Sequence, residues 1–122
     1  MCDESQIRCI ASEEAALLDT LLATSFPGSE TLRHQIENCN VSVLHDGASL
    51  QLTPVIGSKA DVQCRVPVEA TTVDNDGVTI HILLHVVNGF LNELEVYKED
   101  LSPCRTSILG KQIKVSVMHD AF

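Results

Sequence analysis

The segment from Val78 to Tyr97 constrains the fold of this chain more than any other part of the sequence. Its first half alternates apolar residues with others at the two-residue period of a β-strand. Asn88-Gly89 follows, and this dipeptide is a strong turn signal because both residues tolerate a positive φ angle. The second half alternates again, with glutamates between apolar residues. The segment is therefore predicted to form one long β-hairpin.

The length of the connecting loop determines which residues of the hairpin face each other. A two-residue loop would place Glu93 and Glu95 opposite apolar residues of the core. A three-residue loop, residues 87–89, pairs Val86 with Phe90 and keeps the apolar residues of both strands on one face. Because a shift by one residue exchanges the two faces, burial favours the three-residue loop.

In this register the second face of the hairpin carries the side chains that could do chemistry. His81 is expected opposite Glu95, at about 5 Å between the Cβ atoms, which would allow a hydrogen bond. The other expected pairs on this face are Leu83 with Glu93, His85 with Leu91, and Thr79 with Tyr97. The candidate binding surface consists of His81, His85, Glu93, Glu95 and Tyr97.

Two histidines and two carboxylates could hold a divalent metal or act as an acid–base pair. However, His81 and His85 are four residues apart on one strand, which separates them by about 13 Å. One ion cannot bind both, because metal–nitrogen bonds are near 2 Å. A solvated outer face with one cross-strand ion pair is the simpler interpretation, and we assign no metal ligand, cofactor or catalytic residue.

Composition narrows the function further. The 122 residues, of which 44% are apolar, are enough for a single domain over 1–122 with its core at about 12–118. No segment has the length of apolar sequence that a membrane span or a secretory signal needs. The net charge of −9 disfavours nucleic-acid binding. Five cysteines without a C-x-x-C motif predict reduced thiols and a cytoplasmic location.

Two helices are predicted before the strands begin. Ser12 is expected to cap the first helix, which carries four leucines at helical spacing, and Ser29 the second. Later strands are indicated at residues 41–45, 49–53, 62–68 and 113–117. Because helices and strands are segregated, the predicted fold is α+β: two N-terminal helices packed on one face of a mainly antiparallel sheet of five to seven strands.

The turn of residues 74–77, Asp-Asn-Asp-Gly, superficially resembles part of a calcium-binding loop. The match fails because Thr72 occupies the position of the first ligand and Leu83 that of the bidentate glutamate. The sequence also contains no phosphate-binding loop, nucleophile elbow or dinucleotide fingerprint.

The segments DGASLQL at 46–52 and LLHVVNGFLNELEVY at 83–97, followed by Pro103, resemble a family of small uncharacterised α+β domains with an L-H-V-x-x-G-x-L-x-E-L-E-x-Y hairpin motif. The family is classed as a domain of unknown function, so the resemblance implies a fold and no activity. It places His85, Gly89, Glu93 and Glu95 among the recurring positions. Asn88 stands where the family often has Asp.

Three functions remain open. The first is a non-catalytic protein-binding module, similar to inhibitors or immunity proteins, whose acidic surface would bind a basic protein partner. The second is a metal-dependent or acid–base enzyme that uses His81, His85, Glu93 and Glu95. The third is a structural domain that self-associates into a homodimer through its apolar strands.

Overall fold

The computed structural model describes residues 7–44, 47–62 and 64–118 and confirms an α+β fold. The described chain forms two helices and one antiparallel seven-stranded sheet. The helices are α1 (Ser12–Leu22) and α2 (Ser29–Ile36). The strands are β1 (Arg8–Cys9), β2 (Cys39–Val43), β3 (Leu50–Pro54), β4 (Val68–Val73), β5 (Thr79–Val87), β6 (Phe90–Lys98) and β7 (Lys114–Val117).

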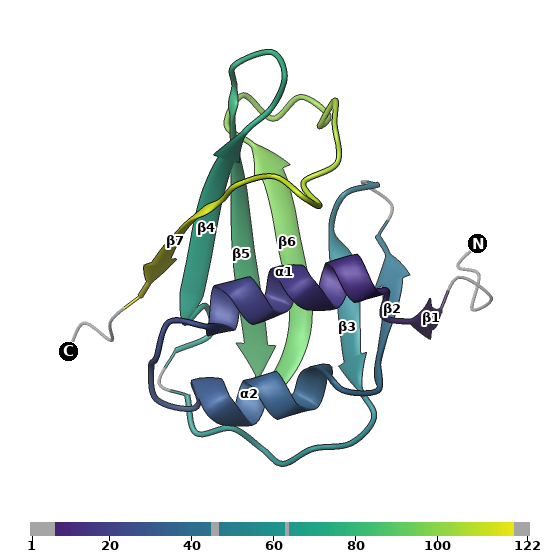
Figure 1. The fold of residues 1–122 in the computed structure, drawn as a ribbon, viewed down its shortest axis with the longest axis vertical. Coiled ribbons are helices and arrows are strands. Elements are labelled where there is room, and N and C mark those ends of the chain that lie inside the picture. Colours follow the sequence, from purple (N-terminus) through teal and green to yellow (C-terminus); the bar gives the residue numbers. More distant parts are fainter. Residues whose placement is uncertain (1–6, 45–46, 63, 119–122) are drawn as a thin grey trace.

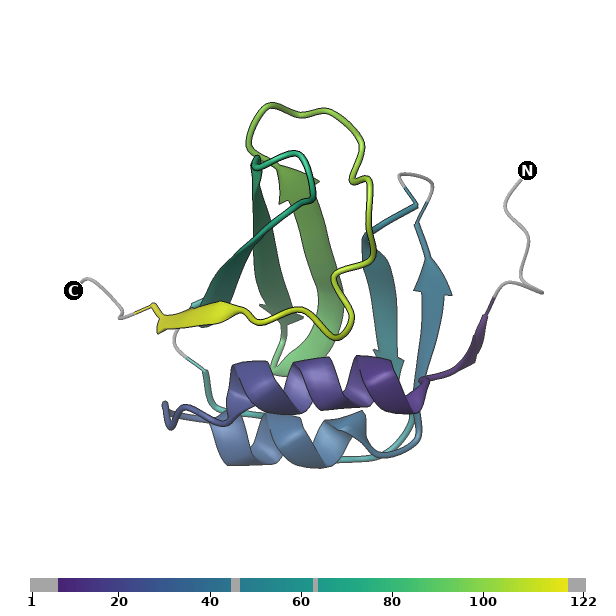
Figure 2. The same ribbon diagram turned by 45° about the horizontal axis from the view of Figure 1, so that its top comes forward.

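The strand order is β1-β2-β3-β6-β5-β4-β7, which places the long β5–β6 hairpin in the middle of the sheet. Both helices lie side by side across one face (Figure 1). The view in Figure 2 shows the same two helices beneath the sheet, with the opposite face uncovered. The predicted arrangement of helices and sheet is therefore confirmed.

Each helix is capped one residue earlier than expected. The N-cap of α1 is Ala11, and its backbone N–H is bound by the side chain of Glu14 at 2.9 Å. The N-cap of α2 is Gly28, whose φ of 91° is accessible mainly to glycine. Ser12 and Ser29 are thus the first residues of the helices rather than their caps. None of the described helices combines the length and the apolar character needed to cross a membrane.

The core forms between the helices and the inward-facing residues of the central strands. The leucine stripe of α1 is buried as predicted, and so are Leu32 and Ile36 of α2. Ile80, Ile82 and Leu84 of β5 are completely buried beneath them. Burying each such side chain contributes about 1.5–3 kcal/mol.

The hairpin register differs from the prediction. The turn contains two residues, Asn88 and Gly89, both with positive φ, and Val87 pairs with Phe90. A β-bulge then inserts Asn92, so that Glu93 lies opposite His85. The bulge shifts β6 by one residue and returns its apolar residues to the helix side. The predicted faces are therefore correct, although the predicted loop and pairing are wrong.

The strand predicted at residues 62–68 is also wrong, since β4 begins only at Val68. Pro67 has no N–H to donate to a sheet ladder, which explains why the regular strand starts after it. His45, at the end of the strand predicted at 41–45, and the following Asp46 lie outside the described residues.

Candidate functional site

The sheet presents an uncovered face on the side away from the helices, called the open face below. All five residues of the predicted binding surface lie on it, because they alternate with buried residues along β5 and β6. The neighbouring strands β3 and β4 add Gln51 and Glu69, which pair with Glu93 and Leu83. The open face is thus continuous across the middle of the sheet.

The bulge changes the partners of the two histidines. His81 lies opposite Tyr97, and their rings stack with centroids 5.0 Å apart. Its Nε2 atom lies 2.6 Å from Glu99, just beyond the end of β6. The expected pairing of His81 with Glu95 is therefore wrong, and Glu95 contacts His85 instead.

His85 belongs to a chain of three polar side chains. Arg65 Nε donates a hydrogen bond to His85 Nδ1 at 3.0 Å, and His85 Nε2 lies 2.7 Å from Glu95 Oε1. With Nδ1 accepting from Arg65, Nε2 is the ring nitrogen that faces the Glu95 carboxylate. Both ring nitrogens are thus engaged within the protein, which holds the ring in place.

The described residues of the open face include two histidines and several glutamates, which are residue types that can bind a metal ion. Among residues 7–44, 47–62 and 64–118, no group of three histidines, cysteines or carboxylates is arranged to hold a metal ion. His81 and His85 each contact a different glutamate. The alternative of a metal-dependent enzyme therefore lacks a ligand set in the described part of the chain.

The open face combines carboxylates with a few apolar and aromatic side chains. Its carboxylates are Glu69, Glu93, Glu95 and Glu99, and its cations are Arg65 and Lys114. Tyr97 is partly exposed and Leu83 is half-buried between them. Four carboxylates against two permanent cations make the described part of this surface acidic.

A second polar cluster, which sequence reasoning missed, lies on the helix side of the sheet. Lys98 at the end of β6 has a side chain with no exposed surface. Its Nζ donates to Asp76 at 2.5 Å and lies 3.1 Å from Asp74, so the Asp-Asn-Asp-Gly turn binds an internal ammonium group. The sequence held a signal for this cluster, because Lys98 continues the inward alternation of Leu94 and Val96.

Asp74 also anchors the segment after β6, residues 99–113, called the strap below. It accepts hydrogen bonds from the backbone N–H groups of Arg105 and Thr106 and from the Thr106 hydroxyl. Burial alone would raise the pKa of Asp74, but these hydrogen bonds and those from Asn75 and Lys98 outweigh it and hold the pKa far below its usual range. Hydrogen bonding by Lys98 likewise lowers the pKa of Asp76.

Comparison with known proteins identifies the family of this chain but no activity or partner. The family model described as "Domain of unknown function (DUF6984)" matches residues 7–108, which is most of the chain. The comparisons with curated proteins and with solved structures found no match. The resemblance predicted from the sequence is confirmed at the level of a domain of unknown function.

Proposed function

We propose that this chain, which belongs to the domain of unknown function family DUF6984, is a non-catalytic protein-binding module that binds a basic protein through its open face. The observation that carries the proposal is the asymmetry of the sheet. Two helices cover one face (Figure 2), while the other carries paired polar side chains and a tyrosine that stacks on His81. Tyrosine is enriched in protein interfaces because it combines a large contact area with a polar end.

The order of the open face supports binding without a large entropic cost. His81 is stacked on Tyr97, and His85 is held between Arg65 and Glu95. Side chains that are already fixed lose little freedom when a partner binds. Because His81, His85, Glu95 and Tyr97 project from central strands, a partner would meet a rigid surface.

Charge supports a basic partner. The net charge of −9 and the carboxylates of the open face would attract a positively charged surface and accelerate its association. Inhibitors and immunity proteins of basic enzymes act in this way. We place the module in the cytoplasm, on the basis of its odd number of cysteines.

The acid–base alternative has less support from the geometry. A general base needs a nitrogen within reach of a substrate proton, and His85 uses both of its nitrogens within the protein. His81 lies between an aromatic ring and a carboxylate.

The test is a capture experiment from extracts of the protein's own cells, with three tagged forms of the chain. One form is unmodified, one carries Glu93→Lys and Glu95→Lys on the open face, and the control carries Glu13→Lys and Glu30→Lys on the helices. Each double substitution changes the net charge of −9 by +4, to −5. The two variants thus differ only in where the charge is reversed, and circular dichroism verifies their folding.

We expect a basic protein to be retained by the unmodified chain and by the helix variant, and to be lost with the open-face variant. Equal retention by all three forms, or loss with the helix variant alone, would contradict the proposal. Sedimentation at the same concentrations tests the third function. A dimer that Glu93→Lys and Glu95→Lys dissociate would assign the open face to self-association instead.

A further inference from the structure

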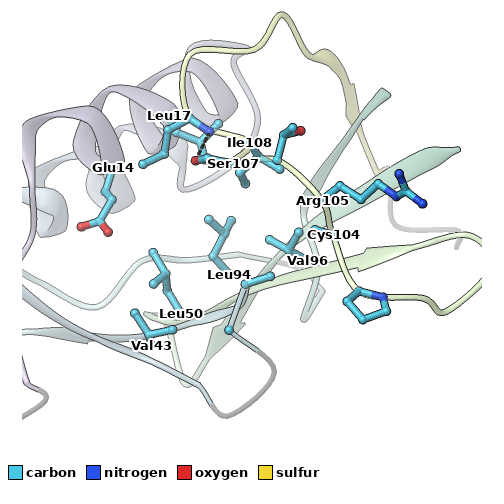
Figure 3. Close-up of a pocket in the computed structure, with 15 residues that line it drawn as sticks. Glu14, Leu17, Val43, Leu50, Leu94, Val96, Cys104, Arg105, Ser107 and Ile108 are labelled. Carbon is cyan, nitrogen blue, oxygen red and sulfur yellow. Dashed lines mark hydrogen bonds between the residues drawn. The ribbon is translucent and has the colours of Figure 1, made fainter. Parts of the chain in front are cut away.

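A cavity of about 410 Å³ lies on the helix side of the sheet, at the end that the helices leave uncovered. Its walls come from α1, β2, β3, β6 and the strap, as Figure 3 shows. The residues that line it are on the helix side and none of them belongs to the open face, so the cavity is distinct from the proposed protein-binding surface. Its volume falls within the usual range of small-molecule sites.

The sheet wall of the cavity lies where β3 meets β6. Among the described residues, these strands pair at Leu50 with Leu94 and at Gln51 with Glu93. At the next residue, the hydroxyl of Ser49 accepts a hydrogen bond from the Val96 N–H at 2.9 Å. The Ser49 side chain thus connects β3 to β6 beside the cavity residues Leu50 and Val96.

The strap forms the opposite wall and is held in place. Asp74 binds the backbone N–H groups of Arg105 and Thr106, and Asp74 is itself fixed by the buried Lys98. Ile108 of the strap is buried against the core. This wall therefore does not have to be ordered by a ligand, which removes one cost of binding.

Two facing walls of the cavity are apolar, while polar residues of the strap and Glu14 complete the lining. In Figure 3, Leu50, Leu94 and Val96 of the sheet line one side, and Leu17 and Ile108 line the other. The guanidinium of Arg105 points away from this space in the same view. An apolar molecule would therefore replace water against apolar surfaces, which is the favourable term in such sites.

The charged groups at the rim are already paired. The carboxylate of Glu14 binds Arg8 at 2.7 Å and 2.8 Å and also the N–H of Ala11. Arg105 lies 3.4 Å from Asp76. A charged ligand would find no unpaired counter-ion among these groups, and burying an uncompensated charge is costly. An anion would in addition be repelled by the net charge of −9.

We propose that this cavity is a binding site for a small, uncharged, largely apolar molecule of about the size of two linked aromatic rings. The sheet, Leu17 and Ile108 supply apolar contact, and Thr106 and Ser107 of the strap make one side of the lining polar without adding charge. The site lies on the helix side, so the molecule can bind whether or not a protein occupies the open face.

The experiment titrates the protein with N-phenyl-1-naphthylamine, an uncharged apolar probe whose fluorescence increases in apolar surroundings. Val43→Trp places a bulky ring at the mouth of the cavity, at a strand residue that is 46% exposed and hence tolerant of change. Val73→Trp is the matched control, because it is also an exposed strand valine, at 52%, on the open face. Ser107→Trp fills the cavity from the strap and serves as a second variant.

We expect saturable binding of one probe per chain, weakened about tenfold by Val43→Trp and Ser107→Trp and changed less than about twofold by Val73→Trp. Methyl NMR spectra should show the probe-induced shifts at Leu50, Leu94 and Val96. No saturable binding by the unmodified chain would overturn the proposal. So would equal binding by the folded variants Val43→Trp and Ser107→Trp, or shifts confined to other methyl groups.

Discussion

Two ionic networks attached to the same hairpin have opposite characters. On the open face, His81 and His85 contact glutamates that are 65% and 39% exposed. On the helix side, Lys98 and its two aspartates form a cluster in which the lysine side chain has no exposed surface. Both networks pair basic side chains with carboxylates, but only the open-face network is exposed to water.

The difference shows how burial separates the two roles. Exposed ion pairs contribute little to stability because water screens them and competes for their hydrogen bonds. A buried charge that loses its partner cannot turn to water, so its cluster becomes structurally indispensable. We therefore assign the Lys98 cluster to holding the strap, and the open-face pairs to presenting a surface.

The largest effect is expected from Asp74→Ala. This change removes a partner of Lys98 and leaves the strap N–H groups of Arg105 and Thr106 without their acceptor. In thermal unfolding, Asp74→Ala should lower the melting temperature more than any of the open-face substitutions. Asp100→Ala is the control, since Asp100 is at the surface and its hydrogen bonds in the described chain go to the nearby Ser102. Similar melting temperatures for the two variants would refute the distinction between the networks.

The second-largest effect is expected on the stability of the protein at acidic pH. Asp74 and Asp76 have pKa values lowered from the ordinary 3.8, so their contribution to stability is complete above that value. It is lost as the pH falls below 3.8 through the lowered values, because the unfolded chain then binds more protons. Lys98 affects stability at alkaline pH instead. Its pKa is raised from the ordinary 10.5, so its contribution to stability is lost only as the pH rises above 10.5.

Urea unfolding between about pH 5 and pH 2 measures this acid dependence. We expect the free energy of unfolding to fall with decreasing pH in the unmodified chain and to fall less in Asp74→Asn. An equally steep decrease in Asp74→Asn would show that other carboxylates cause it. Glu14, whose pKa is lowered by its hydrogen bond from Arg8, is then the first to examine.

The smallest effect is expected on the open face. A double-mutant cycle with His81→Ala and Glu99→Ala should give a coupling free energy of at most about 1 kcal/mol at neutral pH. The coupling should decrease in high salt, because the glutamate is largely exposed. A larger coupling free energy that does not change with salt concentration would show that this pair behaves like the buried Lys98 cluster. The two networks would then differ less than proposed.

Local patterns predicted much of the fold because each depends on neighbours in the chain. The alternation along β5 and the leucines of α1 identify their buried faces without reference to any distant residue. The positions of the candidate residues on one face follow from the same alternation. The pairing register of the hairpin could not be predicted from this alternation. It depends on the bulge at Asn92, and the Asn92 carbonyl accepts a hydrogen bond from Gln51 of the separate strand β3 at 2.8 Å.

The partners of charged side chains were beyond local reasoning for the same reason. His85 binds Arg65, twenty residues earlier, and Lys98 binds a turn twenty-two residues earlier. Periodicity indicates only which face of a strand a residue occupies. It does not indicate which loop crosses that face, and the strap that covers Lys98 has no periodic pattern.

The sequence by itself therefore determined the class of fold, the buried faces of its helices and central strands, and the acidic character of the chain. Those properties depend on hydrophobic periodicity and on formal charge, which are additive along a chain. Only the tertiary structure decided the bulge, the partners of the histidines, the burial of Lys98 and the cavity under the strap. These depend on contacts between distant segments, where packing selects one arrangement among several that are locally acceptable.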